Sequence, residues 1–191
     1  MTTTSLEIPA HRALTIEDLA GFPADSNRYE LIDGALHVSP SPVLLHQRVV
    51  FNIAHDLREA CPVELEVLPA PVDVILGPST LVIPDVFVIP VDRVGLDRIE
   101  NPPLLVVEVL SPSTRLYDLG TKSLAYRAAG VTSYWVVDPV APTMTEYRWE
   151  GGAETARTAE GDEPLVVERP FPLTIVPAEL VKPAGDRRRA P

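Results

Sequence analysis

Residues 104–139 read LLVVEVLSPSTRLYDLGTKSLAYRAAGVTSYWVVDP, and this stretch decides the fold. The apolar run from Leu104 to Leu110 is typical of a central strand that is buried on both faces. It contains one acid, Glu108. An ionised carboxylate in such a strand is costly unless it meets a cation, a metal or several hydrogen-bond donors. Glu108 is therefore predicted to have a partner.

The second half of this stretch predicts a helix and another strand. The helix should carry Asp118 near its N-terminus and Gly130 just past its end, because acids favour the first turn and glycine favours the position after the last. Lys122 lies on this helix, and residues 133–137 form the second strand. A strand with a buried acid followed by a helix with a lysine is the part of the chain most suited to chemistry.

Turn signals and hydrophobic periodicity predict the remaining elements. Upstream, they indicate a short capped helix at 15–19, a β-hairpin at 29–38 that turns at Asp33-Gly34, a helix at 43–60 with Ser41 as its N-cap, and strands at 63–68, 72–76, 81–83 and 86–89. Downstream, strands at 143–149 and 165–168 should form an antiparallel extension joined by a polar linker at 150–164. Together they predict an α/β fold with a mixed central sheet, one helix on each face and an N-terminal β-hairpin extension.

Length and composition indicate one domain with a well-developed core, since the chain has 191 residues of which 46% are hydrophobic. The expected organisation is a flexible N-terminus at 1–14, a single domain at 15–177 and a basic flexible tail at 178–191. The net charge of −11 argues against a large DNA-coating interface. It does not exclude a small metal-dependent site, because bound cations supply positive charge themselves.

Cysteine usage and hydropathy bear on the compartment. The single cysteine, Cys61, excludes an intramolecular disulfide and a cysteine-based zinc site, and fits a reducing compartment. We find no signal-peptide pattern and no apolar run that approaches the roughly 20 residues of a membrane span. We therefore expect a cytoplasmic protein with no membrane partner.

The candidate site comprises Asp85, Glu108 and Lys122, with Glu30 and His46 as possible additions. Two carboxylates from adjacent strands can bind a divalent cation such as Mg²⁺, which favours oxygen ligands and keeps several waters. Such a metal activates water and stabilises charge on a phosphate, and a nearby lysine can neutralise developing charge. The sequence contains no G-x-S-x-G elbow and no phosphate-binding P-loop, which argues against serine-hydrolase and P-loop chemistry.

Each candidate also has a structural interpretation. Asp85 follows a proline and could be only a turn residue, and Glu108 could pair with an arginine. Asp118 and Lys122 are four residues apart and could form a plain surface pair. His46 could cap the polar side of a packed helix. His37 and His55 are expected at the surface.

These residues occur within motifs whose order along the chain is specific. They are YELIDG at 29–34, His46-Gln47, Pro84-Asp85, VEVLSPS at 107–113, Asp118 with Lys122, and YWVVDP at 134–139. With this set the chain resembles the Uma-two family of putative restriction endonucleases, a branch of the PD-(D/E)xK nuclease superfamily. The resemblance covers about residues 15–177 and implies a restriction-endonuclease-like fold.

The resemblance assigns roles to particular residues. The catalytic acids of the superfamily map to Asp85 and Glu108, which are the expected metal ligands. The common pattern has a lysine two residues after the glutamate, where this chain has Leu110. In the resembling family the lysine is transferred to the following helix, which maps to Lys122. Glu30 would correspond to an additional acid near such sites.

The activity that the resemblance implies is hydrolysis of DNA phosphodiester bonds with Mg²⁺ or Mn²⁺. Two alternatives stay open: a catalytically degenerate nuclease-fold module for dimeric assembly or regulation, favoured by the missing lysine at 110 and the acidic surface, and a hydrolase of another phosphate ester. A homodimer is expected, because the strands around Tyr147 and Trp149 and the extra hairpin offer apolar surface.

Overall fold

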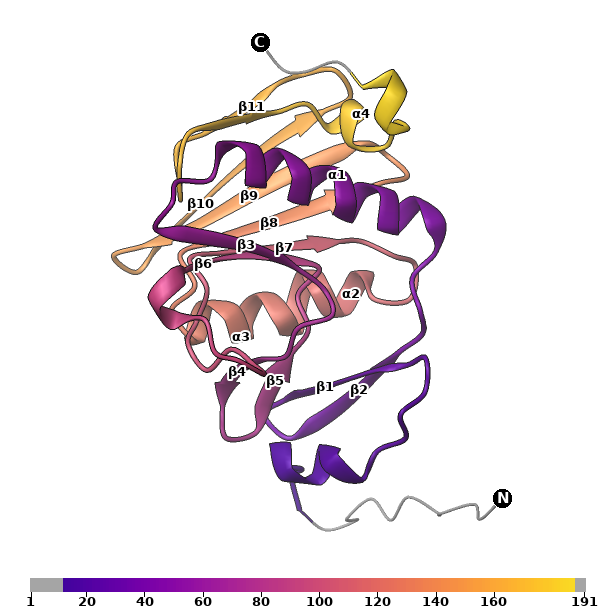
Figure 1. The fold of residues 1–191 in the computed structure, drawn as a ribbon, viewed down its shortest axis with the longest axis vertical. Coiled ribbons are helices and arrows are strands. Elements are labelled where there is room, and N and C mark those ends of the chain that lie inside the picture. The colour runs from indigo at the N-terminus through magenta and orange to yellow at the C-terminus, as the bar shows by residue number, and fades with distance from the viewer. Residues whose placement is uncertain (1–11, 188–191) are drawn as a thin grey trace.

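The computed structural model describes residues 12–187, so residues 1–11 and 188–191 of the expected terminal segments lie outside it. A six-stranded sheet forms the centre of the fold (Figure 1). Only β7 and β8 run parallel, and the other neighbours are antiparallel. The predicted mixed sheet is therefore confirmed. Its strands, from one edge to the other, are β10 (Ala153–Glu160), β9 (Thr143–Glu150), β8 (Ser133–Asp138), β7 (Leu105–Val109), β6 (Val86–Pro90) and β3 (Leu65–Pro69).

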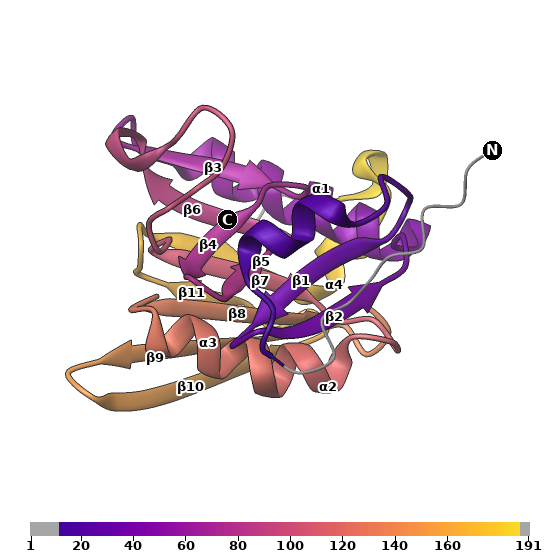
Figure 2. The same cartoon turned by 90° about the horizontal axis from the view of Figure 1, so that it is seen from below.

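Helices cover both faces of this sheet, as predicted (Figures 1 and 2). On one face, α1 (Leu44–Ala60) packs Val49, Ile53 and Leu57 into the core, one residue every helical turn or so. The other face is covered by a helical segment that Tyr126 anchors in a second core cluster. This segment comprises α2 (Arg115–Tyr117), a π-helical turn (Asp118–Lys122) and α3 (Ser123–Ala128).

A second sheet of four strands lies at the N-terminal end, in the order β2-β1-β5-β4. The predicted hairpin is confirmed as β1 (Arg28–Ile32) and β2 (Ala35–Ser39), with positive φ angles of 50° at Asp33 and 77° at Gly34. Such angles are those of a two-residue hairpin turn, which favours Asp-Gly. The hairpin joins a second one, made of β4 (Val74–Gly77) and β5 (Thr80–Val82), through the pairing of Leu31 with Leu81.

The expected linker at 150–164 is wrong, because it contains β10, which pairs with β9 over eight residue pairs. All but one of its residues are exposed, so an edge strand held by backbone hydrogen bonds left no apolar signal in the sequence. The expected partner of 143–149 was the strand at 165–168. That strand, β11 (Leu165–Val167), instead pairs with β12 (Leu173–Ile175).

Helix boundaries differ from the expectation at several points. The short capped helix is confirmed as a 3-10 helix at Ile16–Gly21, and Thr15 and Asp18 form its capping box. The N-cap of α1 is Val43 rather than Ser41, so that helix begins without a side-chain cap. The helix that carries Lys122 starts at Arg115, so Asp118 lies near its N-terminus, as predicted.

The C-terminal part of the described chain packs onto the outer side of α1. The expected boundary between domain and tail, after residue 177, falls within α4 (Pro177–Leu180), and Leu180 is fully buried in the core. A 3-10 turn at Ala184–Asp186 follows.

The aromatic part of the surface on which the homodimer was predicted is largely buried, whereas Val38 of the hairpin is exposed. Trp149 is 8% exposed and stacks on Tyr134 at 5.7 Å between ring centroids, and the partly buried Tyr147 packs on the same ring. These aromatic side chains belong to the core because β8 and the helix behind it cover them.

None of the helices within residues 12–187 has the length and apolar character needed to cross a membrane.

Candidate active site

Two neighbouring strands bring Asp85 and Glu108 to the same end of the sheet. The strands β6 and β7 are antiparallel with Val86 opposite Val107, so Asp85, just before β6, continues this register toward Glu108. The backbone N–H of Val109 donates to Asp85 Oδ2 at 2.9 Å. Both acids are buried, with 3% and 2% of their surface exposed. The pairing of β6 with β7 therefore brings together Asp85 and Glu108, which are far apart in the sequence.

Lys122 reaches this pair from the π-helical turn. Its Nζ lies 2.7 Å from Glu108 Oε1, 2.9 Å from Glu30 Oε1 and 3.9 Å from Asp118 Oδ1. Asp118, Lys122 and Tyr126 are each four residues apart, which places them on one side of the segment. Only 4% of the Lys122 side chain is exposed, so the alternative of a plain surface pair with Asp118 is wrong.

Asp85 is held by partners from three elements. Arg28 Nη1 lies 3.0 Å from Oδ1, and His46 Nε2, on the first turn of α1, lies 3.0 Å from Oδ2. Burial alone would raise the pKa of Asp85, but the hydrogen bond and charge of His46, with Lys122 and Val109, lower it to about 2. Asp85 is thus an ionised carboxylate and not merely a turn residue.

Glu108 and Glu30 share the lysine and have further donors. Tyr126 Oη donates to Glu108 Oε1 at 2.7 Å, and the N–H of Ile83 donates to Glu30 Oε1 at 2.8 Å. Burial raises the pKa of Glu108 well above its ordinary value, although Lys122 opposes the shift. Glu108 therefore pairs with Lys122 and Tyr126, and the alternative of an arginine partner is wrong.

Negative charge is in excess in this cluster, which we call the acid–lysine cluster and define as Glu30, Asp85, Glu108, Asp118 and Lys122. Burial raises the pKa of Asp118 to about 6, since the single lysine only partly offsets desolvation and the other acids. The cluster holds four buried carboxylates, and only the Lys122 ammonium and the nearby Arg28 guanidinium balance them. Another cation would therefore reduce the repulsion among the acids.

The donor set of this cluster fits Mg²⁺. The expected metal ligands, Asp85 and Glu108, stand on neighbouring strands and supply carboxylate oxygens, the ligand type that Mg²⁺ prefers. Within residues 12–187 no three His, Cys, Asp or Glu side chains are already arranged around a metal position. Mg²⁺ is commonly held by only one or two carboxylates, with waters completing its shell, so two acids suffice.

Sequence reasoning missed several residues of the site. Arg28 and Tyr126 were not singled out, although Tyr126 follows Lys122 by one helical turn. His37 was expected at the surface, but it is partly buried and its ring stacks on Tyr117 with centroids 3.7 Å apart. His55 is exposed, as predicted. All five predicted site residues lie in or beside the cluster.

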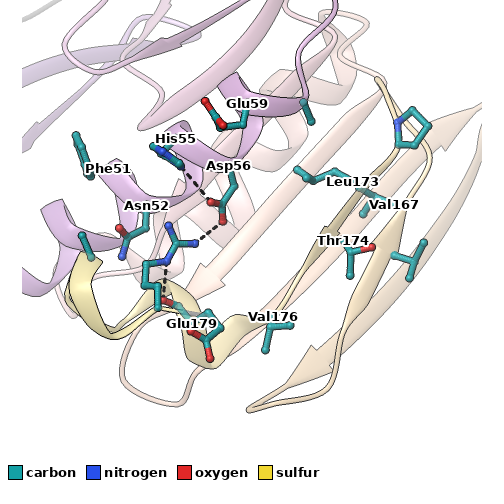
Figure 3. Close-up of a pocket in the computed structure, with 15 residues that line it drawn as sticks. Phe51, Asn52, His55, Asp56, Glu59, Val167, Leu173, Thr174, Val176 and Glu179 are labelled. Atoms are coloured by element: carbon teal, nitrogen blue, oxygen red, sulfur yellow. Dashed lines mark hydrogen bonds and ion pairs between the residues drawn. The ribbon is translucent and has the colours of Figure 1, made fainter. Parts of the chain in front are cut away.

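A pocket of about 640 Å³ lies elsewhere, between the outer side of α1 and the β11–β12 hairpin (Figure 3). His55 and Asp56 stand on one side of it, and Thr174 and Val176 on the other. None of the cluster residues lines it. This pocket and the acid–lysine cluster are therefore separate features of the fold.

Comparisons with known proteins bear on the family and the fold of this chain. A family model, Uma2, described as "putative restriction endonuclease", matches residues 16–179. A crystal structure of a putative nuclease belonging to DUF820 from Anabaena variabilis ATCC 29413 superposes with a TM-score of 0.74 at 17% identity, covering 88% of this chain and 97% of that one. No curated protein matches the chain. The superposition confirms the predicted fold class.

Proposed function

The chain belongs to the Uma2 family of putative restriction endonucleases, and from that membership we propose that it is a metal-dependent endonuclease that hydrolyses DNA phosphodiester bonds. The observation that carries the proposal is the burial of Lys122 against Glu108, beside Asp85. Acidic ligands and a lysine at one point are groups that can support metal-assisted hydrolysis of a phosphodiester. The lysine reaches that point from the helix, although the usual lysine position after the glutamate is Leu110.

Each member of the cluster has a role in this proposal. Asp85 and Glu108 hold Mg²⁺ or Mn²⁺, which when bound supplies an activated water and neutralises phosphate charge. Lys122 orients the attacking water or stabilises the charge that develops on the phosphate. Glu30 fixes the ammonium through its 2.9 Å contact, and His46 fixes the Asp85 carboxylate.

The first alternative is a nuclease-fold module without activity. It is favoured by one observation: Lys122 is already satisfied by two close carboxylates, as a structural ion pair would be. The net charge of −11 also opposes extensive contact with a phosphate backbone. The second alternative, hydrolysis of another phosphate ester, uses the same groups on a smaller substrate.

A cleavage assay separates these possibilities. Plasmid and single-stranded DNA are incubated with Mg²⁺, with Mn²⁺ and with chelator, beside a generic phosphate ester. We expect metal-dependent DNA cleavage that Asp85→Asn and Glu108→Gln abolish, while the exposed acid substitution Glu64→Gln leaves it unchanged. Absence of cleavage by folded wild-type protein would favour the module, and cleavage of the generic ester alone would favour the second alternative.

We also propose a homodimer, on different grounds from the aromatic surface predicted above. The eight-residue strand β10 forms one edge of the main sheet, and no described strand pairs with its outer side. An unpaired edge is a template for another strand. Each copy has one acid–lysine cluster, so two copies would provide one cluster for each strand of a duplex. Light scattering at micromolar concentration should give twice the monomer mass of 20.8 kDa.

A further inference from the structure

Unpartnered polar atoms gather around the acid–lysine cluster. Within residues 12–187, six buried side-chain nitrogen or oxygen atoms have no hydrogen-bond partner. Three of them are His37 Nε2, His46 Nδ1 and Tyr117 Oη, and the others lie on β8 and β9. Leaving a buried polar group without a partner is destabilising, so native proteins rarely keep one without a reason. Because such atoms are concentrated beside one site, we infer that a bound ligand supplies their missing hydrogen-bond partners.

Two of these atoms belong to a stacked pair of rings. In the β1–β2 hairpin His37 lies opposite Glu30, and its ring stacks on Tyr117 at a centroid distance of 3.7 Å and an angle of 12°. Tyr117 ends α2, immediately before the π-helical turn. The Nζ of Lys122 lies 5.9 Å from the centre of the Tyr117 ring. The stack therefore lies beside the lysine; both residues are partly exposed, while Tyr117 Oη and His37 Nε2 are themselves buried.

The protonation states make this pair a source of neutral hydrogen-bond donors. Burial lowers the pKa of His37; the charge of Glu30 opposes this shift, and the charge of Lys122 adds to it. Burial also raises the pKa of Tyr117 far above its ordinary value, so its hydroxyl keeps its proton. A neutral imidazole has one N–H donor and can place the proton on either nitrogen. Both rings can thus donate next to a fixed positive charge.

We propose that the His37–Tyr117 stack binds the phosphate backbone of the substrate strand, with Tyr117 Oη and His37 Nε2 donating to non-bridging phosphate oxygens. This inference rests on the proposed nuclease function. Two donors beside an ammonium suit an anionic, oxygen-rich ligand, and tyrosine hydroxyls commonly make such contacts to phosphates. The neighbouring carboxylates repel a phosphate, so the donors that position it must carry no negative charge.

Removing one oxygen atom tests the proposal. Tyr117→Phe keeps the stacked ring and deletes only the unpartnered hydroxyl. We expect a fluorescently labelled oligonucleotide, with Ca²⁺ in place of Mg²⁺ to prevent cleavage, to bind about 10-fold more weakly, as befits one hydrogen bond to a charged group. His37→Phe should show a similar loss. The matched control is Tyr29→Phe on the same hairpin, which removes a hydroxyl that donates to Asp25 and should leave binding unchanged.

The stability of the ligand-free protein is a second measurement, in which the expected effect of Tyr117→Phe is opposite to the expected loss of oligonucleotide binding. If the Tyr117 hydroxyl awaits a ligand, its removal relieves an unpaired buried group, and Tyr117→Phe should unfold at the same or a higher urea concentration than wild type. A lower midpoint together with unchanged oligonucleotide binding would show that the hydroxyl serves only the fold, through a bound water, and would overturn the proposal.

The outcomes also distinguish this inference from the proposed function. If wild type cleaves DNA and the two ring variants bind and cleave as wild type does, the stack proposal fails while the nuclease stands. If wild type binds the oligonucleotide without cleaving it and Tyr117→Phe binds more weakly, the stack proposal stands and the activity fails. If folded wild type neither binds nor cleaves nucleic acid, both are overturned.

Discussion

Replacing Asp118 by asparagine should stabilise the protein at neutral pH and leave it unchanged in acid. Asp118 is buried among the acids of the cluster, and burial, more than any other cause, raises its pKa from 3.8 to about 6. Lys122 opposes the shift from 3.9 Å without cancelling it. The ionised carboxylate therefore destabilises the folded state, and an asparagine amide of the same shape removes its charge.

The magnitude and the sign follow from proton linkage. A rise from 3.8 to about 6 is about two pKa units, which corresponds to about 3 kcal/mol at about 1.4 kcal/mol per unit. The folded state binds the proton more tightly than the unfolded chain does. Its favourable contribution is fully present below pH 3.8 and is lost as pH rises through about 6. Asp118→Asn should thus exceed wild type by about 3 kcal/mol at pH 8 and equal it near pH 3.5.

Urea unfolding followed by the fluorescence of the buried Trp135 and Trp149 measures this difference across the pH range. Asp138→Asn is a control of opposite sign. Burial alone would raise the pKa of Asp138, but the hydrogen bond from Arg115 and two backbone N–H groups lower it, so its removal should destabilise at pH 8. A pH-independent difference between Asp118→Asn and wild type, or a less stable variant at pH 8, would refute the reasoning.

Three further predictions concern the metal, the lysine and the hairpin turn. Mg²⁺ at about 100 times its Kd should raise the free energy of unfolding by about 2.7 kcal/mol in wild type and much less in Asp85→Asn or Glu108→Gln; equal shifts in all three would place the ion elsewhere. Lys122→Met should cost about 3–5 kcal/mol in urea unfolding at pH 8, because it leaves buried carboxylates uncompensated, and a wild-type midpoint would contradict the cluster as described. Gly34→Ala should cost about 1–3 kcal/mol by thermal unfolding, since φ is +77° and an added Cβ would lie 2.5 Å from Ala13; unchanged stability would mean that the turn relaxes freely.

Local signals in the sequence were sufficient to predict most of the fold. The apolar run around Glu108 indicated a doubly buried strand, and the Asp33-Gly34 pair indicated the hairpin, because in both cases neighbouring residues determine the conformation. The polar strand β10 could not be predicted in this way. It is held at the sheet edge by backbone hydrogen bonds to β9 and buries almost nothing, so its composition resembles that of a loop.

In the site, too, some residues could be predicted from the sequence and others could not. The acids and the lysine carry chemistry that can be recognised in the sequence, and the resemblance placed them in order. Their neighbours could not be predicted, because Arg28 meets Asp85 across 57 positions and the pairing of β1 with β5 that aligns them has no local signal. The spacing of Asp118 and Lys122 suggested a surface pair, since nothing in the sequence reveals that the helix between them widens into a π-turn that faces the sheet.

The distribution of unfavourable features within the fold bears on whether the chain is an enzyme or an inactive module. Replacing a buried ionic cluster by well-packed apolar side chains is often neutral or stabilising, so a fold kept only for assembly gains little from four buried acids around one lysine. Here the acid with a pKa of about 6, the unpartnered atoms of His37 and Tyr117, and the π-turn all occur at one point. Natural proteins keep such local conflicts mainly where function requires them. In a chain of the Uma2 family, their concentration around the acid–lysine cluster favours an active site, and the excess of acid is the feature that a bound divalent cation would relieve.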